Sequence, residues 1–160
     1  MEKNVKQQVE SIAREFLDKI SLTGAQVEVQ EAQEGQFRLA IQTDEPRLYI
    51  GEGGSNLSDI QYLLRLVARK KLNPATPLFI DVDINNYKDA KIQYLKQTAR
   101  SAADDVAITK ITKSLPPMNA YERRIVHSEL SLREDVATES QGEEPYRFIM
   151  IKPKSIIFEF

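Results

Sequence analysis

Residues 48–57 read Leu48-Tyr49-Ile50-Gly51-Glu52-Gly53-Gly54-Ser55-Asn56-Leu57, and a helical pattern begins at the end of this stretch. Glycine has no Cβ, so a ligand can come close to the backbone of such a loop. Free N–H groups at the start of the following helix would attract a phosphate. A glycine-rich turn that only connects packed elements is the alternative interpretation, and the loop alone does not decide between the two.

Apolar periodicity on both sides of the loop predicts the elements around it. Residues 3–20 have the spacing of an amphipathic helix. Alternation over 27–29 and 37–41 predicts a β-hairpin, and residues 78–84 alternate as a further strand. The helix after the loop carries apolar residues on one face and basic residues toward its C-terminal end, where they complement the helix dipole.

The order helix, hairpin, Ile-Gly-x-x-Gly-x-x-Leu, helix, strand resembles a type II KH domain over residues 1–84. The Gly-x-x-Gly loop of KH domains clamps the backbone of about four nucleotides. The resemblance therefore implies that Gly51, Glu52, Gly53 and Gly54 contact nucleic acid. A variable position of this loop is commonly Lys or Arg, whereas the carboxylate of Glu52 would repel phosphate. We expect weakened binding at this loop.

The second half of the chain predicts another small α+β unit, over residues 85–160. A long helix from about Tyr87 to about Lys113 joins the two units, and Pro116-Pro117 ends it. Strands are expected at 136–140 and 146–151, around a turn. The predicted fold class is therefore α+β, with a KH-like unit followed by a second α+β unit.

The stretch Asn119-Ala120-Tyr121-Glu122-Arg123-Arg124-Ile125-Val126-His127 predicts a capped helix. Asn119 is a favourable N-cap, and Glu122 stands three positions later, as a capping box requires. Arg123 and the chain's one histidine, His127, are four residues apart and share a helix face. On a helical wheel Tyr121, Ile125 and Leu132 fall on roughly the opposite side, which we expect to face the core.

An Arg and a His at this spacing are more often a solvated helix face than a binding site. Further cations in the same unit favour a phosphate-binding face, because Arg and Lys pair with phosphate oxygens. These cations are Arg124, Arg147, Lys152 and Lys154. Tyr146 could stack on a base or belong to the core.

Motifs around Arg123-x-x-x-His127 carry a family resemblance. Pro-Pro-Met-Asn-x-Tyr-Glu-Arg precedes the pair, and Glu-Ser-Gln-Gly-Glu-Glu-Pro-Tyr-Arg follows it. This arrangement resembles the Arg-x-x-x-His single-stranded nucleic-acid-binding domain, and the pair of units is similar to the bacterial Jag (KhpB) family. The resemblance implies contacts from Arg123 and His127 to single-stranded RNA, or alternatively to single-stranded DNA. Arg147, Lys152 and Lys154 would flank them.

Composition limits other chemistries. The chain has 160 residues, no cysteine, one histidine and a net charge of −2. We expect no enzyme, catalytic residue, cofactor or metal site, although Asp81 and Asp83 alternate on one strand and could hold a cation. Neither a signal peptide nor a membrane-spanning run is evident, so we expect a cytoplasmic protein without a membrane partner.

A protein-interaction adaptor is the alternative function. In that case the KH surface would dock a partner, and the family resemblance implies a small stand-alone KH protein as a candidate. The apolar segment 156–160 could pair with a partner as an exposed strand, or pack on its own unit.

Overall fold

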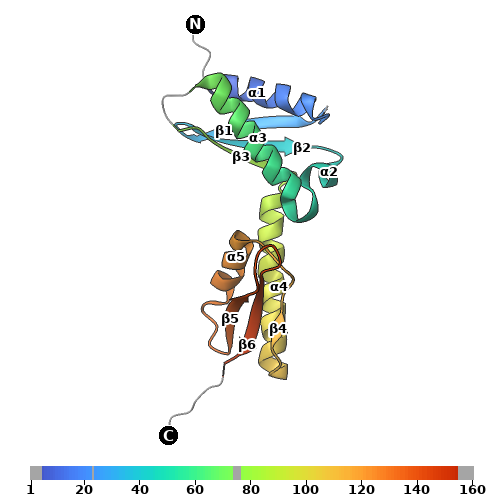
Figure 1. Cartoon of the computed structure of the whole chain (residues 1–160), viewed down its shortest axis with the longest axis vertical. Coiled ribbons are helices and arrows are strands. Elements are labelled where there is room, and N and C mark those ends of the chain that lie inside the picture. The colour runs from blue at the N-terminus through green and yellow to red at the C-terminus, as the bar shows by residue number, and fades with distance from the viewer. Residues whose placement is uncertain (1–4, 23, 74–76, 155–160) are drawn as a thin grey trace. The chain divides into compact units, whose positions relative to one another are not determined.

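The computed structural model describes residues 5–22, 24–73 and 77–154. The chain divides into two compact units, residues 1–88 and 89–160, and each has its own hydrophobic core (Figure 1). The predicted α+β fold class is confirmed. The apolar segment 156–160 lies outside the described residues. Within the described ranges no helix has both the length and the hydropathy needed to cross a membrane.

The first unit contains the element order that the KH resemblance implies, with one short helix more. Its elements are α1 (Val5–Lys19), β1 (Gln26–Gln33), β2 (Gln36–Gln42), α2 (Pro46–Ile50), the 3-10 turn η1 (Glu52–Gly54), α3 (Ser55–Leu72) and β3 (Phe79–Ile84). The additional element is α2, directly before the glycine loop. Its five residues are too few to show a helical period in the sequence.

A three-stranded sheet in the order β1-β2-β3 supports the first unit. The β1–β2 hairpin is antiparallel, while β2 and β3 run parallel. Two rows of buried side chains cross all three strands: Val27–Ile41–Ile84 and Val29–Leu39–Val82. Since alternate residues of a strand share a face, both rows lie on the same face, which α1 and α3 cover (Figure 1).

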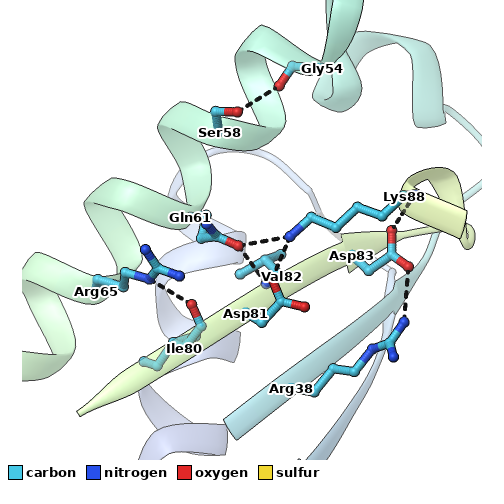
Figure 2. A network of polar contacts seen from close by, with 10 residues as sticks. All are labelled: Arg38, Gly54, Ser58, Gln61, Arg65, Ile80, Asp81, Val82, Asp83 and Lys88. Carbon is cyan, nitrogen blue, oxygen red and sulfur yellow. Dashed lines mark hydrogen bonds and ion pairs between the residues drawn. The ribbon is translucent and has the colours of Figure 1, made fainter. Parts of the chain in front are cut away.

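The free edge of β3 is closed by two side chains from α3 (Figure 2). Gln61 Oε1 accepts a hydrogen bond of 2.9 Å from the backbone N–H of Val82. One turn later, Arg65 Nε donates to the carbonyl of Ile80 at 2.6 Å. An open strand edge invites another strand to pair, and these bonds occupy its polar groups. Arg65 is thus engaged within its own unit.

The second unit consists of all but the first two residues of α4 (Tyr87–Thr109), together with β4 (Lys113–Ser114), α5 (Ala120–Leu130), β5 (Val136–Gln141) and β6 (Phe148–Pro153). Its strands form an antiparallel sheet in the order β4-β6-β5. The predicted long helix ends at Thr109, earlier than expected, and Lys110 follows it with a φ of 59°. The two-residue strand β4 is too short for a sequence pattern to reveal.

The core of the second unit lies between one sheet face and the two helices. Ile149 and Ile151 of the central strand β6 are fully buried, as are Ala99 of α4 and Val126 of α5. Small residues on α4 let that helix pack closely. Because side chains alternate along a strand, Lys152 points to the opposite sheet face.

The predicted core-facing side of α5 is wrong for two of its three residues, while Ile125 does pack against the core. Tyr121 and Leu132 are 64% and 93% exposed, whereas Arg123 is only 8% exposed and Val126 is fully buried. Leu132 lies beyond the end of the helix at Leu130, so helical spacing does not apply to it. Arg123 takes an inward position because its charge finds partners inside the unit, which a helical wheel cannot show.

Candidate nucleic-acid interface

The first turn of α5 is fixed by the predicted capping box. Asn119 Oδ1 accepts a hydrogen bond of 3.0 Å from the Glu122 N–H, and Glu122 Oε2 accepts one of 2.9 Å from the Asn119 N–H. Both bonds satisfy N–H groups that a helix start otherwise leaves without a partner. This prediction is confirmed, and the box sets where Arg123 and His127 fall.

Arg123 is a buried connector. Its Nη1 donates to the Met118 carbonyl at 2.7 Å, and its Nη2 forms an ion pair of 2.7 Å with Glu144 Oε1. Met118 precedes α5, while Glu144 lies in the turn between β5 and β6. The expectation that the Arg123 side chain points away from the core is therefore wrong.

His127 lies against β5. Its Nδ1 is 2.7 Å from the Thr138 hydroxyl, and the ring is half-buried. Burial lowers the pKa of His127, and the nearby positive charge of Arg123 lowers it further. The imidazole is therefore neutral near pH 7. A neutral ring can stack on a base or exchange one hydrogen bond, but it brings no positive charge to a phosphate.

Arg147 joins the same cluster from the turn before β6. Its Nε donates to the Ser140 hydroxyl at 2.9 Å. Ser140 and Thr138 are two residues apart on β5 and therefore share a sheet face. The Arg147 carbonyl also accepts a bond of 3.0 Å from the N–H of Met118, whose own carbonyl binds Arg123. The structure thus brings Arg123, His127 and Arg147 together.

Two predicted cations keep an uncompensated charge. Arg124 is exposed, and Arg147 is bound to a neutral hydroxyl. Among the described residues neither of these two arginines forms an ion pair with a carboxylate. Arg124 thus leaves a positive charge on the outward side of α5, which favours an anionic ligand, whereas the turn that carries Arg147 also carries the exposed acids Glu143 and Glu144.

The two predicted lysines lie elsewhere. Lys152 is on the opposite sheet face, where it forms an ion pair with Glu139. Lys154 follows β6, and its Nζ lies 3.4 Å from the carbonyl of Arg133, near the start of β5. Arg147 is bound at the other end of that strand. The structure therefore does not bring Lys152 and Lys154 into the Arg123–His127–Arg147 cluster.

Tyr146 is 76% exposed, so the interpretation of Tyr146 as a core residue is wrong. It lies in the turn before β6 begins at Phe148, where strand alternation does not yet apply. In the chain, Tyr146 lies between Glu144 and Arg147, which both belong to the contacts of the cluster. An exposed aromatic beside this cluster offers a surface on which a base can stack.

The residues that hold the cluster together were not predicted as site residues, although three of the four stand within the quoted motifs. They are Met118, Thr138, Ser140 and Glu144. The predicted strand over 136–140 does place Thr138 and Ser140 on one face. The motifs contain Met118, Ser140 and Glu144 but give no contacts, because these contacts join residues far apart in the chain.

The glycine loop of the first unit has the backbone that glycine permits. Gly51, Gly53 and Gly54 have φ values of 73°, 62° and 90°. A Cβ on Gly54 would lie 3.0 Å from the ring of Tyr87, and one on Gly51 would lie 2.6 Å from the side chain of Asn56. At Gly51 and Gly54 close packing as well as φ requires glycine.

Charge at this loop is unfavourable for phosphate. Glu52 is exposed within the loop. The segment 44–59 carries three further exposed acids, Asp44, Glu45 and Asp59, and one exposed base, Arg47, which gives a net charge of −3. Backbone geometry therefore permits a close approach, while the local charge opposes an anion.

The acidic pair on β3 is engaged by protein groups (Figure 2). Asp81 forms an ion pair of 2.5 Å with Lys88, while Asp83 accepts a bond of 3.1 Å from the Lys88 N–H and pairs with Arg38. In the described part of the chain, no group of three or more His, Asp or Glu residues could hold a metal ion. Asp81 and Asp83 anchor the start of α4.

Known proteins resemble this chain along most of its length. A family model described as the R-3-H domain, named after its Arg-x-x-x-His motif, matches residues 93–153. The RNA-binding protein KhpB of Clostridium symbiosum is 33% identical over 154 residues, which cover 93% of this chain and 68% of that protein. The chain belongs to the KhpB family.

Other KhpB proteins match with more limited coverage. The RNA-binding protein KhpB of Bacillus subtilis strain 168 is 32% identical over 80% of this chain, and that of Lactiplantibacillus plantarum is 28% identical over 71%. The aligned regions span 61% and 34% of these two proteins. The R-3-H match contains Arg123, His127 and Arg147.

Proposed function

We propose that this KhpB-family chain binds single-stranded RNA, without catalysis, through the Arg123–His127–Arg147 cluster of its second unit. The observation that carries the proposal is Arg147, a cation without an acidic partner among the described residues, held beside the neutral ring of His127. The R-3-H match and the names of the KhpB relatives support the same ligand. We also propose a cytoplasmic location, where bacterial RNA is found.

Each residue of the cluster has a proposed role. Arg147 and Arg124 bind phosphates, because a guanidinium offers a planar pair of donors. His127 stacks on a base or donates one hydrogen bond, and the exposed ring of Tyr146 provides a second stacking surface. Arg123 contributes positive charge from below the surface, and a phosphate can replace the Glu144 carboxylate at its Nη2.

The remaining predicted residues contribute less. Lys152 and Lys154 would meet RNA only where a strand extends beyond the cluster, since both lie away from it. The loop Gly51–Gly54 adds a weak contact because its acidic surroundings oppose phosphate.

Salt dependence of RNA binding tests this proposal. Contact with about four phosphates gives a slope of about −3 for log affinity against log salt on a single strand. Fluorescence anisotropy with a labelled twelve-nucleotide oligouridine measures it. Replacing both Arg124 and Arg147 by Gln should flatten the slope by about 1.4, because two phosphate contacts are lost. An affinity that does not change with salt concentration, or a double variant that binds normally, would refute the proposed site.

A protein-docking role for the first unit is the second candidate function. The solvent face of α3 exposes Tyr62, Leu63 and Leu66, with 62%, 47% and 46% of their surfaces accessible. A contiguous apolar helix face of this kind suits a partner's apolar face. The candidate partner is a small stand-alone KH protein. A pull-down with nuclease treatment tests it, and a Leu63→Glu variant should lose a direct protein contact while RNA binding by the second unit persists.

A further inference from the structure

We propose that the outward face of α5 holds a second nucleotide, with a base stacked on Tyr121 and its phosphate bound by Arg124 and Lys96. This inference rests on the proposed function and extends it. The first cluster lies on the flank of α5 that meets β5, whereas this position lies on the flank toward α4.

The position is a hollow between α4 and α5. Its volume is about 300 Å³, at the lower end of the range for ligand sites. Six residues line it: Lys96, Tyr121, Arg124, Ile125, Ser128 and Glu129. All of them belong to the second unit, so the hollow does not depend on how the two units are arranged.

Tyr121 supplies the aromatic surface. Its side chain is 64% exposed, although the sequence pattern predicted it to be buried. Ile125 lies one helical turn later and packs on the core of the unit, so it provides an apolar floor beside the ring. Every nucleobase has a flat π-face, and stacking on a tyrosine therefore accepts any base.

The charges around the hollow favour an anion. Glu129 is the one acid that lines it, with 13% of its side chain exposed, and it is already engaged twice. Arg100 Nε donates to it at 2.6 Å, and Lys96 Nζ lies 3.5 Å away. The hydrogen bond from Arg100 lowers the pKa of Glu129, and the charge of Arg100 lowers it further, so the carboxylate remains ionised. Arg124 has no carboxylate partner in the described part of the chain. Three cations thus stand against one carboxylate, which leaves a local net charge of about +2.

One row of residues links this hollow with the first cluster. Tyr121, Arg124 and His127 are spaced three apart on α5, and such residues form a continuous ridge on a helix surface. An aromatic ring, a cation and a neutral imidazole then follow one another along the ridge. Along a nucleic-acid strand, bases and phosphates alternate in the matching order of base, phosphate and base. This sequence of groups favours a single strand over an acidic peptide, which has no bases to stack.

Tryptophan fluorescence provides a direct test, because the chain contains no tryptophan. A Tyr121→Trp variant would carry one fluorophore in the hollow. Tyr94→Trp is a matched control, since Tyr94 is also 64% exposed and belongs to α4 of the same unit. On titration with a twelve-nucleotide oligouridine, emission should be quenched in the Tyr121→Trp protein and unchanged in the Tyr94→Trp protein.

Affinity measurements separate this inference from the proposed function. Tyr121→Ala should weaken binding about tenfold, because one base loses its stacking surface, while Tyr121→Phe should bind normally. If Tyr121→Ala binds as well as Tyr94→Ala while Arg147→Gln, which leaves the hollow intact, is impaired, the hollow is not a nucleotide site and the proposed function stands. If the unmodified chain does not bind RNA at all, both fail. Quenching by a polyglutamate peptide but not by RNA would also overturn the inference.

Discussion

The carboxylate of Glu144 holds the guanidinium of Arg123, with 2.7 Å between Oε1 and Nη2. Glu144 is more than half exposed, while Arg123 is almost buried. An acid thus occupies the side of Arg123 that faces solvent. In the proposed complex a phosphate competes for this position, since carboxylate and phosphate oxygens accept the same guanidinium donors.

Replacement of Glu144 by Gln should therefore strengthen RNA binding. The neutral amide still accepts a hydrogen bond from Arg123 but competes less with phosphate, so we expect affinity to rise severalfold. Because Glu144 is more than half exposed and the amide oxygen still accepts from Arg123, the loss in unfolding free energy should stay within about 1 kcal/mol. Anisotropy titrations at two salt concentrations measure the affinity.

Glu143→Gln is the control for that change. It removes the same charge from the neighbouring exposed position, whose side chain has no ion-pair partner among the described residues. An equal gain from both variants would show that net charge alone matters, and that Glu144 does not compete at Arg123.

Arg123 and Arg124 are adjacent but should differ strongly in their effect on stability. Arg123→Ala leaves the buried Met118 carbonyl without its donor, and an unsatisfied group of this kind costs about 1–3 kcal/mol. Arg124→Ala removes an exposed side chain and should cost less than about 0.5 kcal/mol. Urea unfolding of both variants measures the difference. Equal losses would contradict a structural role for Arg123.

His127 should titrate below the ordinary histidine pKa of 6.5, because burial and the charge of Arg123 both disfavour its protonated form. It is the chain's one histidine, so its ring gives a single set of resonances in a proton NMR titration. A midpoint at or above 6.5 would contradict the structure around Thr138.

The same shift gives His127 a defined effect on stability. Between its lowered folded-state pKa and 6.5, the unfolded chain binds more protons than the folded chain. The free energy of unfolding should therefore fall as the pH drops from 6.5 through the folded-state pKa. A His127→Gln variant should lack this fall in the free energy of unfolding. If its pH profile matches that of the unmodified chain, the fall is caused by other titratable groups.

Local features of this fold could be predicted from the sequence, and tertiary ones could not. The capping box joins Asn119 and Glu122, three residues apart, so the spacing alone reveals it. The burial of Arg123 depends on Glu144, which lies in another turn of the chain. A helical wheel places charged residues outward. It therefore predicts an exposed Arg123 and a buried Tyr121, whereas the structure has Arg123 buried and Tyr121 exposed.

In the first unit, the sign of the charge at position 52 should determine whether the glycine loop binds RNA. The φ values of Gly51, Gly53 and Gly54 already allow a close approach to the backbone, while exposed Glu52 adds to an acidic surface. Glu52→Lys should raise RNA affinity and steepen the salt slope by about 0.7, the contribution of one further phosphate contact on a single strand.

Glu34→Lys makes the identical charge change in the turn between β1 and β2. Residues 43–46, which lead to the glycine loop, follow β2 at the other end of the sheet, so Glu34 lies away from the loop. A gain confined to Glu52→Lys would mean that the loop is a working clamp limited by its charge. If both variants gain equally, attraction is general and the loop makes no specific contact. If neither gains, its backbone does not bind phosphate, and the first unit is left with the apolar face of α3 as its candidate binding surface.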